Sequence, residues 1–242
     1  MLYKINYLYY FLIFSSCLLS ANGYSQVYQM PESVKSHWAG IQVGAAPALK
    51  TGFTGGWQLP AIGKHTPLLT ASVATPVFLL KKPDTFEGKV GLADYLSFYQ
   101  QWGVTIGISA TVATTKNTNG RITTAGTALT LIPGYRTHHW YAGAWINWQY
   151  NYAAHLRHSD YVQDSFDDRY ESGETESAPY QGWVSMNTSI LQLGAAAGYS
   201  VKAYSIHLNA GYQTVPGPLH INSLPDVGIL PFGGSVSLLY HW

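Results

Sequence analysis

Apolar and polar residues alternate along several long stretches of this 242-residue chain. In 102–115 the even positions are apolar as far as Val112, and the odd positions carry Gly, Thr, Ser or Ala. The same alternation occurs in 140–155, 204–213 and 232–242. Because successive side chains of a β-strand point to opposite faces, this period of two predicts strands with one apolar and one polar face.

We predict an all-β fold in which ten such strands form a closed antiparallel transmembrane β-barrel with long extracellular loops. Ten satisfies the rule that bacterial single-chain barrels have an even number of strands. Pro47 and the Gly55-Gly56 pair weaken the first two strands, so eight strands with 24–60 as an extension or plug are the alternative. The expected strands are 38–47, 53–60, 67–80, 88–99, 102–115, 121–133, 138–155, 187–201, 203–215 and 232–242.

A two-sheet sandwich would also alternate in this way, but three features favour the barrel. Several stretches far exceed the roughly 5–6 residues of an average strand and reach the about 9–11 that a tilted membrane strand needs. The polar face carries small uncharged residues and His, whereas a water-exposed face normally carries Lys and Glu. Aromatic residues, which favour the headgroup level of a membrane, stand near strand ends. These are Trp57, Tyr99, Trp102, Trp140, Tyr204, Tyr212 and Trp242.

The expected connections differ in length between the two ends of the barrel. Outer-membrane barrels have short periplasmic turns and longer outer loops. With ten strands and both termini periplasmic, the connections near 100–101, 134–137 and 202 are short and periplasmic, and 61–66 is intermediate. The outer connections are longer, and they include 81–88, 116–120, 156–186 and 216–231.

The N-terminus has the pattern of a secretory signal. Lys4 precedes a largely apolar run, and small residues surround a cleavage point after Gly23. We therefore expect a cleaved signal peptide in 1–23, a periplasmic segment in 24–37, and a barrel in 38–242 that resides in the bacterial outer membrane. The sole cysteine, Cys17, falls within the signal, so no disulfide is expected in the mature chain.

Charge is scarce in this chain. Charged residues make up 10% of it and hydrophobic residues 47%, whereas soluble domains average roughly 25% charged residues. The formal net charge of +1 lacks the basic footprint of nucleic-acid-binding proteins. There is no glycine-rich phosphate loop between a strand and a helix. We expect neither a nucleic-acid partner nor a cofactor.

The last residues, 233–242, place apolar side chains at Val236, Leu238, Tyr240 and Trp242. This ending resembles the closing strand of bacterial outer-membrane β-barrels, in which Phe most often takes the place of Trp242. The resemblance is one of architecture and singles out no functional family. It implies that the barrel assembly machinery recognises the strand ending Tyr240, Trp242, and that outer-membrane lipid and lipopolysaccharide surround the barrel.

The interior of such a barrel is narrow, because eight strands leave a space that side chains just fill and wide aqueous channels need about 16–18. We expect a narrow channel or a binding barrel for a small solute. Alternatively, the interior side chains hydrogen-bond each other and plug the barrel. The candidate lining residues are Thr105, Ser109, Thr111, Asn147, Gln149, Asn151, His155, Ser205, His207, Asn209 and Gln213.

The loop 156–186 carries most of the acidic residues of the chain. A structural or interaction protein that meets a surface partner through this loop is therefore the alternative function. Carboxylate oxygens suit Ca²⁺, but the spacing fits no calcium-loop pattern, so we expect a solvated loop without a defined metal site. The acids are Asp160, Asp164, Asp167, Asp168, Glu171, Glu174 and Glu176; the weak metal candidates among them are Asp164, Asp167, Asp168 and Glu171.

One constellation contains the residue types of a nucleophilic hydrolase, namely His155, His158, Ser159 and Asp160. It is remotely similar to outer-membrane lipid A deacylases, which carry a His and a Ser close together on a strand. In that group the two residues are two positions apart and face the same side, whereas His158 and Ser159 are adjacent and face opposite sides of a straight strand. We treat the four as weak catalytic candidates and expect no enzyme.

Overall fold

The computed structural model describes residues 37–45, 49–63, 65–76, 86–117, 120–171, 181–214 and 232–242. The expected signal peptide 1–23 and the segment before His37 lie outside the described residues. The same is true of the expected connection 216–231 and of Glu174 and Glu176.

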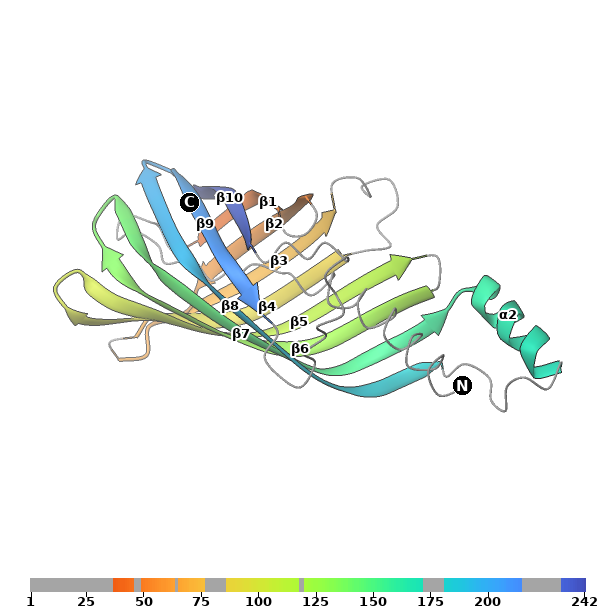
Figure 1. Cartoon of the computed structure of the whole chain (residues 1–242). Helices are drawn as coiled ribbons and strands as arrows, with labels where there is room; N and C mark the ends of the chain where they lie inside the picture. The colour runs from red at the N-terminus through yellow and green to blue at the C-terminus, as the bar shows by residue number, and fades with distance from the viewer. Residues whose placement is uncertain are drawn as a thin grey trace.

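Ten antiparallel strands close into one barrel (Figure 1). Each strand pairs with its neighbour in sequence, and β10 closes the ring against β1. The first two strands belong to this ring, so the eight-stranded alternative is excluded. The strands are β1 (His37–Ala45), β2 (Leu49–Gln58), β3 (Leu68–Pro76), β4 (Phe86–Tyr99), β5 (Trp102–Asn117), β6 (Gly120–Arg136), β7 (Trp140–His158), β8 (Gly182–Val201), β9 (Tyr204–Thr214) and β10 (Phe232–His241).

The two ends of the barrel differ only partly as expected, because the connection 59–67 on the side of the short turns has nine residues and the connection 46–48 on the opposite side has three. The connections 100–101, 137–139 and 202–203 are short and lie at one end, the turn end; the helix α2 (Asp160–Glu171) lies at the other, the α2 end (Figure 1). Gln100 and Lys202 have φ values of 45° and 54°, the left-handed conformation of tight hairpin turns. No helix among the described residues is long and apolar enough to cross a membrane.

Two expected connections at the α2 end are shorter than predicted. The connection expected at 116–120 shrinks to 118–119, because β5 and β6 both extend further. The expected loop 156–186 contains the end of β7, the helix α2 and the start of β8. As a result, β5 to β8 project further toward α2 than the other strands (Figure 1).

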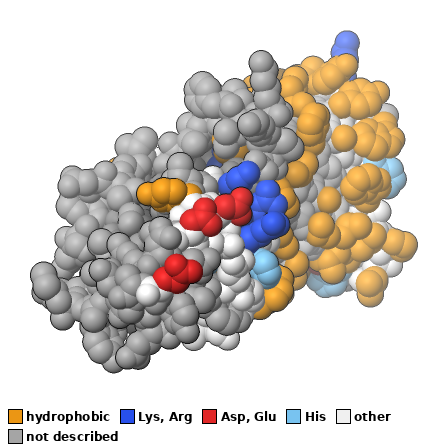
Figure 2. All heavy atoms as spheres, turned by 90° about the vertical axis from the view of Figure 1, so that its right-hand side faces the viewer, with side chains coloured by type: hydrophobic (Ala, Val, Ile, Leu, Met, Phe, Trp, Pro, Cys, Tyr) orange, Lys and Arg blue, Asp and Glu red, His pale blue; other side chains and the backbone are white. Residues whose placement is uncertain are grey.

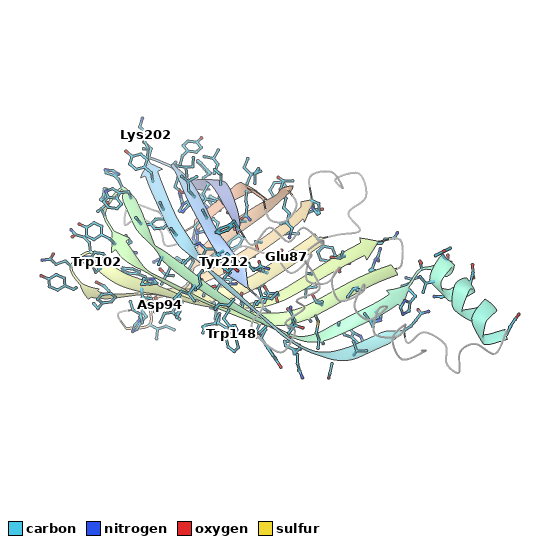
Figure 3. The ribbon with its side chains drawn as sticks, in the orientation of Figure 1. Glu87, Asp94, Trp102, Trp148, Lys202 and Tyr212 are labelled. Atoms are coloured by element: carbon cyan, nitrogen blue, oxygen red, sulfur yellow. The ribbon has the colours of Figure 1, made fainter. Side chains whose placement is uncertain are left out.

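The two faces of the sheet have opposite chemistry. On β5 the side chains of Ile106, Ile108 and Val112 point outward and are exposed, whereas Thr105 and Thr111 point inward and are buried. Trp148 likewise points away from the barrel (Figure 3). The alternation of the sequence therefore separates an apolar outer surface from a polar interior.

Candidate functional site

Nearly all of the side chains that we predicted to line the barrel point into its interior. Asn147 is 1% exposed, while its outward neighbour Trp148 is 48% exposed, so alternate positions divide cleanly between the two faces. The inward-facing members of the predicted set are Thr105, Ser109, Thr111, Asn147, Gln149, Asn151, Ser205, His207, Asn209 and Gln213.

His155 is the exception, and its expected place in the interior is corrected. The pairing of β7 shifts between Asn151 and Ala153, which makes a one-residue bulge at Tyr152. Beyond the bulge the alternation changes parity, so Ala154 is buried and His155 turns to the outer face. There its ring packs edge-on against Trp183, with the ring centroids 5.2 Å apart.

A continuous polar row crosses the inner wall from β4 to β8. Its members, Lys89, Thr111, Gly126, Asn151 and Thr188, lie directly opposite one another on successive strands. Thr111 is 4% exposed and Thr188 is 1% exposed, yet neither hydroxyl has a hydrogen-bond partner among the described residues. Because buried polar groups are normally satisfied, this polar row offers unused hydrogen-bonding capacity to the interior.

Nearer the turn end, a second row of side chains is satisfied internally. Thr130 donates to Asn147 Oδ1 at 2.8 Å, and Asn147 Nδ2 donates to Gln192 Oε1 at 2.8 Å. Gln192 Nε2 then donates to Gln213 Oε1 at 2.9 Å. This amide relay links β6, β7, β8 and β9 with every donor pointing the same way around the wall, an arrangement in which each hydrogen bond strengthens the next.

A histidine cluster occupies the interior closer still to the turn end. Tyr141 OH lies 3.0 Å from His207 Nδ1, and Ser205 Oγ lies 2.9 Å from His207 Nε2. The same Ser205 hydroxyl lies 2.6 Å from Nε2 of His241. These side chains are almost fully buried and join β7, β9 and β10 into one hydrogen-bonded unit.

Bulky apolar side chains fill the interior at this level. Trp145 and Tyr141 are buried in a cluster with Ala93, Ile132 and Ala196, which draws on β4, β6, β7 and β8. We call this cluster the aromatic layer. The Trp145 indole lies so close to Gly194 that a Cβ there would be 2.5 Å from its Nε1. Packed rings therefore occupy part of the interior on the turn-end side of the polar row.

A charged cluster faces the interior from β2 and β4. Lys50 Nζ lies 3.4 Å from Glu87 Oε2, and Lys89 Nζ lies 3.3 Å from Glu87 Oε1. One carboxylate thus bridges two ammonium groups that are largely withdrawn from solvent. Such charges are tolerated inside a protein only when they are paired in this way.

Sequence reasoning missed this cluster, as well as Thr130, Tyr141, Thr188, Gln192 and His241. The signal that could have located Glu87 and Lys89 is the alternation itself, because they stand between the outward-facing Phe86 and Val90. The others share the inward parity of their strands, but only the register between strands shows which side chains they meet.

The candidate catalytic residues do not come together. The backbone carbonyl of Ser159 accepts hydrogen bonds from the N–H groups of Val162 and Gln163, so Ser159 forms the start of α2. Within the described ranges its side-chain hydroxyl has no hydrogen-bond partner, and hence no described imidazole is paired with it. Asp160 is exposed in the first turn of the helix, and His155 lies against Trp183.

The acidic segment is helical, where a solvated loop was expected. Asp164 and Glu171 are exposed on α2, and the side chains of Asp167 and Asp168 lie outside the described residues. Within the part of the chain that the structure describes, no group of three or more potential metal ligands occurs. The helix carries acidic groups away from the barrel wall and brings none of the described ones into a metal-binding arrangement.

Two shallow apolar hollows lie on the outer surface of the barrel. One is lined by small side chains of β7, β8 and β9, including Ala142, Ala197 and Ala210. The other crosses β1 to β5 and includes Ala39 and Ala71. Both arise where alanine stands between large outward-facing side chains.

The comparison with known proteins adds no functional assignment. No protein-family model matches the chain, and no curated protein is similar to it in sequence.

Proposed function

We propose that this chain is an integral outer-membrane β-barrel whose interior holds a small polar solute. The observation that carries the proposal is the reversed polarity of the molecule. Phe53, Ile108 and Tyr204 are 69%, 59% and 57% exposed on the outer face, while amide and hydroxyl side chains are buried inside.

Water is a poor solvent for such a surface. Leaving one large apolar side chain in water rather than burying it forgoes about 1.5–3 kcal/mol, and the outer face carries such residues on every strand of the ring. Contact with acyl chains removes this penalty. The closed ring supports the same placement, because an open sheet edge in lipid would leave backbone groups without hydrogen bonds.

The outward aromatic residues support a membrane of ordinary thickness. Trp102, Trp140 and Tyr204 stand at the turn end, and Trp148 and Tyr212 stand further along their strands (Figure 3). Tyr204 and Tyr212 are eight positions apart on β9. At about 3.3 Å per residue and a tilt of about 40°, the two rings differ in height by about 20 Å, close to the apolar band of about 25 Å in such barrels.

The membrane placement is tested by an arginine on the outer face. Ile108→Arg should lower the stability of the barrel in phosphatidylcholine vesicles by about 2–4 kcal/mol, because the charge would lie near the bilayer midplane. Ile62→Arg is the matched control, since Ile62 is 71% exposed on the connection after β2. Urea unfolding measures both variants. If Ile108→Arg shifts stability by no more than about 0.5 kcal/mol, as a surface substitution in water does, the membrane proposal fails.

The polar row supports the solute part of the proposal. Two hydroxyls without a partner in the described part of the chain, Thr111 and Thr188, lie on either side of Asn151 on the inner wall, and each unpaired buried polar group costs about 1–3 kcal/mol. A small polar solute that enters from the α2 end would pair with these hydroxyls after the side chains that cover them move aside. The aromatic layer beneath it supports retention rather than free passage.

This role is tested with glycerol, D-ribose and D-glucose as uncharged probes, measured by saturation-transfer NMR on the folded chain. The double variant Thr111→Val with Thr188→Val should weaken binding of any probe about tenfold or more, the effect of losing about 1.4 kcal/mol. Thr127→Val, on the outer face of β6, should change nothing. A chain that binds none of the probes, or a double variant that binds them as before, would overturn the solute role.

Export and assembly belong to the same proposal. The signal pattern in 1–23 supports export of the chain. We place the segment 24–37 that follows it in the periplasm. Outward-facing Tyr240 and Trp242, whose rings stack 6.1 Å apart at the turn end, support recognition of the last strand by the assembly machinery.

A further inference from the structure

The histidine cluster in the interior forms a chain of hydrogen bonds near the turn end. Tyr141 OH lies 3.0 Å from His207 Nδ1, and His207 Nε2 lies 2.9 Å from Ser205 Oγ. Ser205 Oγ lies 2.6 Å from Nε2 of His241. Hydroxyl groups and neutral imidazoles can each donate one hydrogen bond and accept another, so the direction of such a chain depends on where its hydrogens lie.

The single hydroxyl hydrogen of Ser205 links the states of the two imidazoles. Both rings present Nε2 to the same oxygen, but Ser205 can donate its hydrogen to one ring only. The other ring completes the chain by carrying a hydrogen on Nε2 and donating it to Ser205. A neutral imidazole carries one ring hydrogen, so the choice made at one histidine determines the choice at the other.

One neutral arrangement uses the hydrogens of both hydroxyl groups within the chain. Tyr141 donates to Nδ1 of His207, and His207 donates from Nε2 to Ser205. Ser205 donates to Nε2 of His241, which carries its own hydrogen on Nδ1. This Nδ1 atom is buried and has no hydrogen-bond partner among the described residues. Since His241 is the last residue of β10, the chain ends on the side of the short turns.

The neighbouring strands decide where a positive charge fits best. Arg136 of β6 lies directly opposite Tyr141, and its guanidinium carbon lies 3.9 Å from the ring centroid of Tyr95. The residues directly opposite the cluster on β1, β8 and β10 are uncharged: Trp38, Gly198, Ser200, Ser237 and Leu239. Figure 2 looks onto the α2 end and shows acidic and basic side chains gathered there, at the other end of the barrel. Because His207 contacts the tyrosine that lies opposite Arg136, a positive charge is better placed on His241.

We propose that the histidine cluster is a proton switch through which the pH on the turn-end side acts on the aromatic layer. The added proton resides on Nε2 of His241, which then donates to Ser205. Ser205 turns its hydrogen to Nε2 of His207, and the hydrogen that His207 carried there moves to Nδ1. Tyr141, a member of the aromatic layer, thereby changes from a donor to an acceptor. The switch lies on the turn-end side of the polar row and does not depend on solute binding.

The test follows the imidazole hydrogens by NMR. The full chain carries nitrogen-15 in its histidine rings and is folded in phosphatidylcholine nanodiscs. It is titrated from about pH 8 to about pH 3, a range that includes the ordinary histidine pKa of about 6.5. The ring nitrogen shifts distinguish a nitrogen that carries a hydrogen from a bare one, and His207→Gln and His241→Gln assign the two rings. As His241 becomes charged, the hydrogen of His207 should move from Nε2 to Nδ1 in the same step.

Two substitutions of Ser205 form a matched pair. Ser205→Ala removes the shared hydroxyl, so His241 should still take up a proton while the hydrogen of His207 stays on one nitrogen. Ser205→Thr keeps a hydroxyl and should restore the coupled change. His155→Gln is the control on the outer face and should leave the titration of both interior rings unchanged. Gel mobility before and after heating verifies that each variant is folded.

The outcomes separate a switch from a purely structural cluster. A coupled change that is lost in Ser205→Ala and restored in Ser205→Thr supports the switch. The proposal is overturned if His207 keeps its hydrogen on one nitrogen while His241 becomes charged, or if Ser205→Ala shows the same coupled change as the wild type. It is also overturned if the wild-type barrel unfolds before His241 takes up a proton. Each of these results leaves the solute role to its own test with the Thr111 and Thr188 variants.

Discussion

Two adjacent glycines of β2 show how closely the interior is packed. A Cβ on Gly56 would lie 2.3 Å from Nε1 of the Trp38 indole, so the ring occupies the space that any side chain would need. Trp38 is 1% exposed and packs with Leu239 of β10. Gly55 faces the other way, and a Cβ there would meet nothing closer than 3.4 Å. The same residue type therefore has a packing role at one position and none at the next.

Alanine substitutions separate the two positions. Gly56→Ala should lower the free energy of unfolding by about 1–3 kcal/mol, because the added methyl group forces the Trp38 ring to shift. Gly55→Ala should leave the free energy of unfolding unchanged or raise it by up to about 1 kcal/mol, because alanine lowers the conformational entropy of the unfolded chain. Urea unfolding followed by tryptophan fluorescence compares them. Equal effects at both positions would show that the indole does not fill the space over Gly56.

Individual strands follow the local alternation closely. All ten expected strands are present, and β5 begins at Trp102 and β10 at Phe232 as predicted. Pro76 is the last described residue of β3 and lies opposite Lys50 of β2. The errors are concentrated at the α2 end. There β7 continues to His158 and β8 already begins at Gly182. Pairing with a long neighbouring strand keeps these residues extended, although their own alternation of apolar and polar positions is weak.

The bulge and the helix of this region were not evident from the chain alone. The extra residue at Tyr152 reverses the alternation, so His155 joins the outer face while its sequence neighbours suggested the interior. The helix α2 is polar and acidic and lacks a clear apolar face. Its start is stabilised by the carbonyl of Ser159 and by Asp160 in the first turn, where a negative charge is favourable.

The molecule as a whole has an interior that changes character along its axis. The polar row faces the interior on the α2 side, the amide relay follows, and the aromatic layer and the histidine cluster lie toward the turn end. The large interior side chains are therefore concentrated toward the turn end. Trp145 is the largest side chain of the aromatic layer, and it is the residue whose removal should open the interior most.

Planar-bilayer recordings test this closure. The wild-type barrel should be electrically silent, and Trp145→Ala should produce single-channel current steps, since the indole no longer fills the space beside Gly194. Trp148→Ala is matched in chemistry but lies on the outer face, so it should remain silent. Because Trp→Ala exchanges cost about 3–5 kcal/mol in packed sites, gel mobility before and after heating verifies folding. Equal conductance of the wild type and Trp145→Ala would contradict the closed interior.

Period-two alternation is a local property, so the residues themselves indicate that the chain forms strands and, where no bulge intervenes, which side chains share a face. The choice between eight and ten strands needed the closed ring of the structure. It is for this reason that Asn147, Gln149 and His207 could be assigned to one face before any strand was paired with another. Which of them touch is a matter of register, set by the closure of the ring and by the bulge at Tyr152. The amide relay and the polar row each join side chains from several strands, and no single stretch of sequence contains the information that brings them together.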